Sequence, residues 1–412
     1  MEVLHPRCAG IDIGKKVLAV GVRIEGAGRA RSQTKVTKYA TMTTDILALR
    51  EDLVRQEVSC VVMESTGDYW KPVYYLLEGA PFELIVGNAA QIRNLPGRKS
   101  DVSDASWLAQ LGAHGLVRPS FVPPPLIRDL RDLTRDRTSF VRHRAQMLNR
   151  VEKVLEEAAI KLSSVASELD GVSCRAMLAA LVAGERDPQV LAGLARGRMR
   201  AKLPQLGQAL TGRFSEHYAF RIRMLLEQVD NLSNAVAQYD EQIEVAIEPY
   251  RWFRDLITSV PGIARATANV ITAETGADMD QFPTAKHLAS WAGVAPGSNE
   301  SAGVIKSSKT RKGNTHLKGA LGNAAMSASR TKNTYLAKRH WRIAARRGKL
   351  KALVATEHAI LTAIWYMGTT RTSYIDPGPD FFTSLHPDRV KRHALNQLKE
   401  LGYEVTLTPA AS

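Results

Sequence analysis

Short apolar runs in the first quarter of the chain predict the strands of a sheet. Residues 8–24, CAGIDIGKKVLAVGVRI, contain two such runs around a Gly-Lys-Lys turn, a pattern typical of a β-hairpin. A third strand is expected near 33–40. The apolar runs CVVMES at 60–65 and FELIVG at 82–87 predict two more strands.

Apolar residues at helical spacing lie between these strands. They predict helices over 43–57 and 68–79, and a third helix within the segment GRKSDVSDASWLAQL at 97–111. A hairpin and a third strand followed by alternating helices and strands predict a mixed sheet covered by helices, an α/β fold. The proline cluster PSFVPPP at 119–125 marks the end of this unit, because proline interrupts regular structure.

Two long amphipathic stripes follow the prolines, over 126–162 and 216–248. Stripes of this length favour an antiparallel helix pair or an oligomerising coiled coil. The residues between them, 163–212, predict a small inserted helical module whose sequence indicates no function. A further helix-rich unit precedes a tail with a helix near 387–401. We therefore predict four parts, at residues 1–125, 126–250, 251–368 and 369–412.

Charge adds the first indication of a partner. The chain of 412 residues has 56 Lys and Arg against 41 Asp and Glu, a net charge of +15. Such an excess favours a polyanion through phosphate contacts and counterion release, although a merely basic soluble protein is the plain alternative. The length is enough for two or three domains, each with its own core.

The cysteines and the apolar runs bear on the compartment. Cys8, Cys60 and Cys174 lie far apart and form no C-x-x-C pair, which argues against a zinc site or a disulfide framework and fits a reducing compartment. The first ten residues lack a signal-peptide pattern, and no apolar run approaches the ~20 residues of a membrane span. We expect a cytoplasmic protein with access to DNA or RNA and no membrane partner.

Four acidic residues form the main candidate for chemistry. Asp12 follows the first strand, Glu64 ends the fourth, and Asp101 and Asp104 share one face of a helix at i and i+3. If that helix crosses the sheet edge, the four carboxylates meet and need cations between them. Mg²⁺ suits such all-oxygen ligands, and two ions about 4 Å apart clamp a phosphodiester. Taken singly, each acid is also explained as a turn residue or a solvated helix face.

A second basic unit lies in the C-terminal third. TSVPGIARATANVITAETG at 258–276 is consistent with a helix-hairpin-helix, in which Gly262 lets the turn approach a phosphate, and equally with an ordinary turn between helices. From Ser301 to Lys351 there is no acidic residue. This glycine-rich, basic stretch predicts a loop before a helix, and such a loop is a good phosphate-binding surface. With the basic approach to the acids, the predicted nucleic-acid contacts are Arg98, Lys99, Gly262, Lys306, Lys309, Arg311, Lys312 and Lys318.

Serines in the same stretch offer a nucleophile. Ser298, Ser301, Ser307 and Ser308 all lie between or beside its glycines, and spacing does not choose among them. No His or Asp stands nearby in sequence to act as a base.

These motifs, in this order, resemble those of a known family. Asp12 in AGIDIG, Glu64 in VVMESTG, the acids of GRKSDVSDA, Pro261-Gly262-Ile263 and the AGVAPGSNESAG…TRKGNTHLKGAL block are similar to the insertion-sequence 110 family of DEDD transposases, which are recombinases guided by a bridge RNA. The resemblance covers about residues 8–160 and 216–368.

The resemblance implies more than the residues do alone. It implies a RuvC-like, RNase H-fold domain that carries the four acids and binds Mg²⁺, with two ions expected from the geometry of phosphodiester chemistry. It also implies a coiled coil and a mainly helical transposase domain whose nucleophilic serine corresponds to Ser301. It further implies a dimer or tetramer in which the acids of one protomer meet the serine of another, double-stranded donor and target DNA, a structured bridge RNA, and a nucleoid-associated bacterial protein.

Three functions are therefore compared. The first is an RNA-guided DNA recombinase that forms a phosphoserine intermediate with Mg²⁺ assistance. The second keeps the acids and is a RuvC-like, structure-selective DNA endonuclease acting by hydrolysis. The third is a non-catalytic basic scaffold that binds nucleic acid. The complete set of four acids favours the first two.

Overall fold

The structure is a computed structural model that describes residues 2–26, 31–65, 67–93, 104–297, 299–307, 309–385 and 387–407. Its internal contacts divide the chain into two compact units, Met1–Pro123 and Pro124–Ser412. The division falls within the proline cluster, where the ring of each proline prevents the helix that follows from starting earlier.

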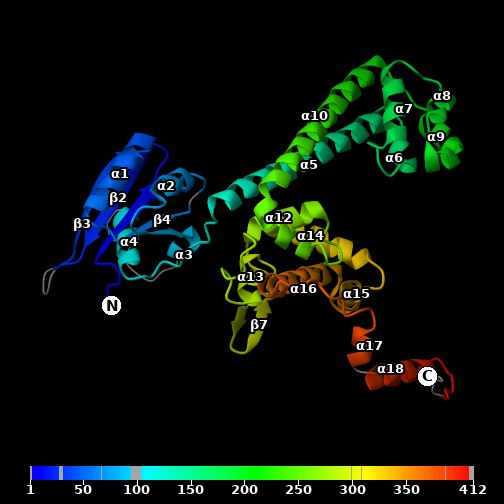
Figure 1. The fold of residues 1–412 in the computed structure, drawn as a ribbon. Coiled ribbons are helices and arrows are strands. Elements are labelled where there is room, and N and C mark those ends of the chain that lie inside the picture. The colour runs from blue at the N-terminus through cyan, green and yellow to red at the C-terminus, as the bar shows by residue number, and fades with distance from the viewer. Residues whose placement is uncertain are drawn as a thin grey trace. The chain divides into compact units, whose positions relative to one another are not determined.

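The first unit is built on a five-stranded mixed sheet (Figure 1). Its strands are β1 (Arg7–Ile13), β2 (Val17–Ile24), β3 (Gln33–Ala40), β4 (Cys60–Glu64) and β5 (Glu83–Gly87), in the order β3-β2-β1-β4-β5. The first three strands pair antiparallel, and β4 is parallel to both β1 and β5. The mixed sheet predicted from the alternation of strands and helices is the one that the structure contains.

Helices cover both faces of this sheet, which explains why β4 is apolar up to its last residue, Glu64. On one face α1 (Thr43–Arg55) and α2 (Trp70–Leu77) bury a core with Ile11 and Met63. On the other face α4 (Asp104–Ala113) packs on Cys8, Cys60 and Val62, and the short α3 (Ala89–Arg93) contributes Ile92.

A glycine in β1 sets how closely α4 approaches the sheet. A Cβ at Gly10 would stand 2.2 Å from the carbonyl oxygen of Ala105 and 2.3 Å from the backbone nitrogen of Ala109. Any larger residue would therefore push the helix away from the strand. This contact places the first turn of α4 over the carboxyl-terminal half of β1.

The second unit begins with two long helices that pack along each other, α5 (Pro125–Glu157) and α10 (Glu216–Ala246). Arg137 of α5 donates to both carboxylate oxygens of Asp240 on α10, at 2.5 and 2.9 Å. The rings of Phe140 and Tyr239 meet beside this pair, with centroids 5.3 Å apart. The supercoiling expected of a coiled coil stays a prediction.

Between the long helices the chain folds into a small helical module. It comprises α6 (Leu162–Val165), α7 (Val172–Val182), α8 (Pro188–Gly193), the 3₁₀ helix η1 (Gly197–Lys202) and α9 (Leu203–Ala209). Its core continues into the adjoining ends of α5 and α10 through Val151, Leu155 and Ile222. The module is thus packed onto the helix pair rather than tethered to it.

The rest of the second unit is a helical domain around the buried helix α16 (Lys349–Thr370). Around it lie η2 (Glu248–Tyr250), α11 (Arg251–Ile257), α12 (Arg265–Thr275), α13 (Ala285–Trp291), α14 (Thr315–Arg330) and α15 (Tyr335–Arg347), with a hairpin of β6 (Asn299–Ser301) and β7 (Val304–Ser307). The tail carries α17 (Phe381–Leu385) and α18 (Pro387–Glu400). Among the described helices, none has the length and apolar composition needed to cross a bilayer.

Candidate active site and nucleic-acid interface

Two of the predicted acids come from neighbouring parallel strands. Asp12 directly follows Ile11 in β1, Glu64 directly follows Met63 in β4, and Ile11 and Met63 are paired in register. Parallel strands end at the same sheet edge, so both carboxylates stand at the edge where β1 and β4 finish.

Alternation along the strands decides which face these side chains occupy. Gly10 faces α4, as its close contact with that helix requires, and Val62 lies in the core beneath α4. Side chains two residues apart point to the same face of a strand, so Asp12 and Glu64 lie on the α4 face as well. Asp104 is the first residue of α4. Three acids far apart in sequence are therefore brought to one corner of the sheet.

The remaining residues of this predicted site, Asp101, Arg98 and Lys99, lie outside the residues that the structure describes. Asp12 and Asp104 are exposed and Glu64 is half-buried. Within the described ranges, these three acids do not bring their oxygens within 4.8 Å of one another as a set. The corner is thus an open arrangement of carboxylates, and metal binding by it stays a prediction.

A tighter group of metal-type side chains lies at the opposite sheet edge. The ligand atoms of His5, Cys60 and Glu83 are all within 4.8 Å of one another. The spacing of the cysteines gave no sign of this group. A hydrogen bond with Cys8, together with burial, raises the pKa of the Cys60 thiol, which keeps it protonated. Both cysteines also pack in the core beneath α4, a structural role that free cysteines commonly have.

The serine stretch forms a hairpin where the sequence analysis expected a loop. Ser301 ends β6 and pairs with Val304 at the start of β7. The two residues between them, Ala302 and Gly303, have φ values of 52° and 76°. Positive φ at both positions is the geometry of a type I′ turn, which explains why a glycine is present. Ser301 therefore stands next to an exposed hairpin tip; its side chain is not among those described, nor is that of Lys306.

The segment after the hairpin packs tightly at Gly313 and is exposed at residues 309, 311 and 312. A Cβ at Gly313 would stand 2.3 Å from the backbone nitrogen of Gly293, so these segments touch through backbone alone. Lys309, Arg311 and Lys312 are exposed. They are available to a polyanion.

Two predicted nucleic-acid contacts have internal roles. The half-buried Lys318 donates from its ammonium to the carbonyl oxygen of Gly293 at 3.1 Å and to Thr310 Oγ1 at 3.3 Å. Gly262 has φ 95°, and a Cβ there would stand 2.5 Å from the carbonyl oxygen of Ala324. Packing of the α11–α12 turn on α14 thus explains Gly262. For both residues, contact with nucleic acid stays a prediction.

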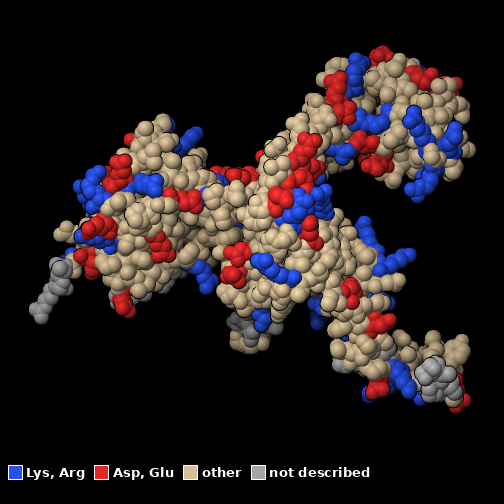
Figure 2. Space-filling view, viewed as in Figure 1, with Lys and Arg blue, Asp and Glu red and all other residues tan. Residues whose placement is uncertain are grey.

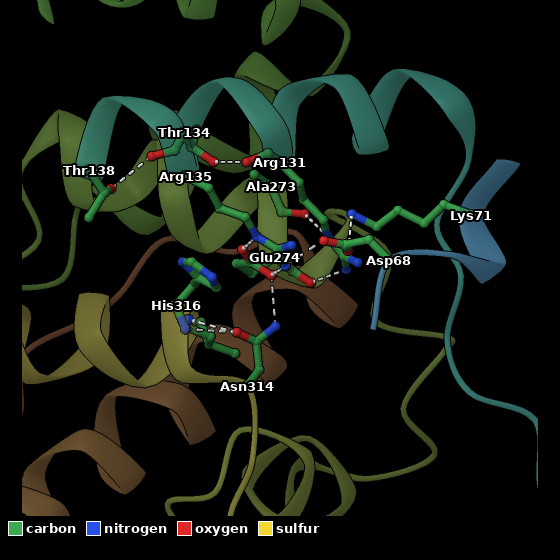
Figure 3. A network of polar contacts seen from close by, with 11 residues as sticks. Asp68, Lys71, Arg131, Thr134, Arg135, Thr138, Ala273, Glu274, Asn314 and His316 are labelled. Carbon is green, nitrogen blue, oxygen red and sulfur yellow. Dashed lines mark hydrogen bonds and ion pairs between the residues drawn. The ribbon is translucent and has the colours of Figure 1, made fainter. Parts of the chain in front are cut away.

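A buried ion-pair network that the sequence analysis missed joins α5 to α12 and α14 (Figure 3). The fully buried Glu274 accepts hydrogen bonds from Arg135 Nε at 2.7 Å, from a second nitrogen of that guanidinium at 2.8 Å, and from Asn314 Nδ2 at 2.7 Å. Arg131 donates to the backbone carbonyls of Ala273 and Glu274. Asn314 also caps α14 by accepting from the backbone nitrogens of residues 316 and 317.

Charge in this network shifts the titration of its members. Burial by itself would raise the pKa of Glu274, but hydrogen bonds and charge from Arg135, with Asn314 and Arg131, lower it below its ordinary value. Burial, followed by the charge of Arg135, lowers the pKa of His316. The carboxylate therefore stays ionised and the imidazole neutral at physiological pH.

Beside the network lies a cavity of about 400 Å³ between α5, α12 and α14. None of the described residues that line it is acidic. Its polar lining residues are Thr134, Arg135, Arg137, Thr138, Arg142, Thr267, His316 and Asn323. Helix periodicity could have placed Arg135 and Arg142 on one side of α5, but only the tertiary structure brings residues from α14 to them.

Two models of known protein families match this chain, one over the sheet unit with its acids and one over the basic helical domain. A DEDD transposase model of the IS110 type matches residues 9–160, and the model "Transposase IS116/IS110/IS902 family" matches residues 254–342. The first match implies an RNase H-like fold, with which the five-stranded mixed sheet agrees. An RNase H-like sheet with acids at the ends of β1 and β4, joined to a basic helical domain, defines a transposase of the DEDD class.

The family follows from the two matches together, which cover more than half of the chain. The chain belongs to the IS110 family of transposases. A similar protein is the "Insertion element IS110 uncharacterized 43.6 kDa protein" of Streptomyces coelicolor, which is 32% identical over 143 residues. That alignment covers 34% of this chain and 35% of the relative.

Proposed function

We propose that this protein is a DNA recombinase that moves an insertion sequence by cutting and rejoining DNA strands. The observation that carries the proposal is the gathering of Asp12, Glu64 and Asp104 on the α4 face of one sheet edge. Membership of the transposase family supports it, and so does the net charge of +15, which suits a polyanionic substrate. Double-stranded donor and target DNA are the proposed substrates.

In the proposal Asp12, Glu64, Asp101 and Asp104 hold divalent metal, which DEDD transposases generally use. The donor set fits, because hard carboxylate oxygens are the ligands that Mg²⁺ prefers. Bound there, Mg²⁺ would polarise a phosphodiester and stabilise the charge that develops on its oxygens. Asp12 and Glu64 are well suited to this task, since each is fixed by a strand within a buried sheet.

Ser301 is the proposed nucleophile. Its Oγ attacks phosphorus, and the Oγ–phosphorus bond forms as the bond to the leaving deoxyribose oxygen breaks; the proton of the serine hydroxyl ends, through solvent, on that leaving oxygen. A deoxyribose hydroxyl of another strand then attacks the phosphoserine and releases the serine. The covalent intermediate keeps the phosphoester bond for rejoining, whereas attack by water would lose it. Lys309, Arg311 and Lys312 would bind the backbone around this centre.

Two further parts of the proposal come from the family resemblance. A structured bridge RNA would select the donor and target sites, and the acids of one protomer would meet Ser301 of another within a dimer or tetramer. Ser301 belongs to the second compact unit and the acids to the first, so the proposed site requires residues of both units.

Strand exchange on matched donor and target DNA, with the RNA present, tests the proposal. We expect Asp12→Asn and Ser301→Ala to abolish recombination, because one removes a metal ligand and the other the nucleophile. Glu51→Gln on the exposed side of α1 and Ser307→Ala in the same hairpin are the matched controls. Recombination by Ser301→Ala at the parent rate would show that the serine assignment is wrong.

A denaturing gel for protein-linked DNA separates the alternatives. A covalent adduct that Ser301→Ala lacks supports the recombinase. Cleaved DNA with free ends and no adduct indicates a hydrolytic nuclease, and DNA binding without Mg²⁺-dependent cleavage indicates a scaffold.

A further inference from the structure

The inserted helical module carries an exposed basic segment that no part of the proposed chemistry uses. It lies between the two family matches, which end at residue 160 and resume at 254. From Pro188 to Ser215 the chain has no acidic residue. Within this stretch, η1 and the residue before it present four exposed basic side chains, which we name the η1 patch: Arg196, Arg198, Arg200 and Lys202.

The arginines of this patch contribute no buried side chain to the module, whereas Lys202 donates from its ammonium to the carbonyl oxygen of Val165 at 2.7 Å. The helices on either side of η1 are anchored by buried Leu191, Ala192 and Leu206, whereas η1 itself contributes no buried residue. Its arginines therefore extend from a segment that is held at both ends by its neighbours. Among the described contacts, none of the side chains of Arg196, Arg198 and Arg200 has an internal partner that would explain why these three arginines occur within five positions.

Other arginines around the module are used differently. Arg175 pairs with Asp170 and Asp230, and Arg186 pairs with Glu216. In the described part of the chain, the three arginines of the η1 patch form no ion pair with an acidic side chain. Figure 2 shows basic side chains gathered on the lobe that α7, α8 and α9 form. The module thus combines neutralised arginines that hold it to α10 with a patch whose charge is uncompensated.

We propose that the η1 patch binds the phosphate backbone of double-stranded DNA, outside the reaction centre; this inference rests on the proposed function. Uncompensated arginines gain affinity by replacing counterions at phosphates. A duplex is favoured over single strands because the one aromatic residue between Pro188 and Ser215 is Phe214, which is buried, so this segment itself offers no ring for stacking on unpaired bases. The module packs on the first half of α10, from Ala219 to Asp230, and the remaining residues of that helix, at ~1.5 Å each, separate it from α11, so the patch would contact flanking DNA.

The test is fluorescence anisotropy of the full-length protein with a long DNA duplex of arbitrary sequence, over a range of salt concentrations. The variant is Arg196→Gln with Arg198→Gln and Arg200→Gln. Each lost phosphate contact lowers the slope of log K against log salt by about 1, so we expect the slope to fall by about 3. At ~0.1 M salt the affinity would fall on the order of 100-fold.

The matched control removes the same charge elsewhere. It carries Lys35→Gln and Lys38→Gln on the exposed edge strand β3 and Arg31→Gln just before that strand. We expect it to keep most of the affinity, and both variants to keep the parent's circular dichroism spectrum. An η1 variant with the parent's slope and affinity would overturn the inference, and so would an equal loss in the control, which would indicate net charge alone.

A parallel titration with an RNA duplex distinguishes the other source of phosphates. Loss of RNA binding with unchanged DNA binding would overturn the assignment to DNA. Strand exchange by the parent protein is measured in the same preparations. If the parent exchanges strands and the η1 variant binds DNA as the parent does, the role of the patch is rejected and the proposed function stands. If the parent does not exchange strands, the proposed function itself is rejected.

Discussion

Neutralising Glu274 should loosen the junction between α5, α12 and α14. Glu274→Gln keeps the shape of the side chain but removes the charge that faces Arg135 and Arg131. Breaking one side of a buried ion pair costs about 3–5 kcal/mol, because the partner charge is left uncompensated. Since 30% of the Arg135 side chain is exposed, water can partly solvate it, and we expect the lower end, about 3 kcal/mol.

Native-state hydrogen exchange is the suitable assay, because a chain with two compact units need not unfold in one step. A loss of about 3 kcal/mol corresponds to exchange roughly 100-fold faster for the protected amides of α12 and α14. The control is Glu241→Gln at an exposed position of α10, which should change local stability by less than ~0.5 kcal/mol.

A second variant separates charge from packing. Glu274→Gln combined with Arg135→Gln removes both partners, and we expect it to be more stable than Glu274→Gln alone by about 0.5–3 kcal/mol, the usual coupling of adjacent residues. Amides of α12 and α14 that exchange in Glu274→Gln at the parent rate would refute the reasoning, since a fully buried carboxylate would then contribute nothing to the junction.

Three other predictions follow from the packing and titration of described residues. Gly10→Ala should separate α4 from β1, lower the free energy of unfolding in urea by about 1–3 kcal/mol and abolish strand exchange. Gly193→Ala, whose Cβ meets nothing within 4 Å, should leave the stability and the strand exchange unchanged. Gly262→Ala should lower the free energy of unfolding of the second unit by a similar ~1–3 kcal/mol in thermal unfolding. Gly319 lies at an exposed position of helix α14, where alanine favours the helix, so Gly319→Ala should raise that free energy by about 0.5–1 kcal/mol. The folded-state pKa of Glu274 is lowered, so its ionised form stabilises the folded protein fully above the ordinary glutamate pKa of about 4.3. This stabilisation is lost as the pH falls through the folded-state pKa. The stability of Glu274→Gln, measured by acid unfolding, should therefore lack this part of the pH dependence.

The sequence by itself determined the elements and their order in the first unit. Apolar runs of strand length, each bounded by turns or helical stripes, predicted β1, β2, β4 and β5, because such short runs differ from the helical period of 3.6. The exposed and polar β3 was expected near 33–40 without such a run. Asp12 and Glu64 could be paired from the sequence for a related reason. Each acid ends an apolar strand, and parallel neighbours end at the same edge.

Local pattern was a weaker guide in the serine stretch. Glycine-rich polar sequence predicted a loop, but positive φ at Ala302 and Gly303 allows a two-residue turn that closes β6 on β7. The pair Ala-Gly is a poorer signal for such a turn than Asn-Gly, since alanine seldom adopts φ above zero. The hairpin therefore became visible only in the structure.

Tertiary structure alone decided the contacts between residues distant along the chain. Glu274 and Arg135 are 139 positions apart, and nothing in either local sequence indicates that a glutamate of α12 is fully buried against α5. Lys318 likewise is, from the sequence, one more basic residue in a run without acids. Only the structure shows that its ammonium donates a hydrogen bond to the carbonyl oxygen of Gly293. Periodicity reports which face of an element is apolar, whereas the partner of a buried charge is fixed by how the elements pack, which no local pattern encodes.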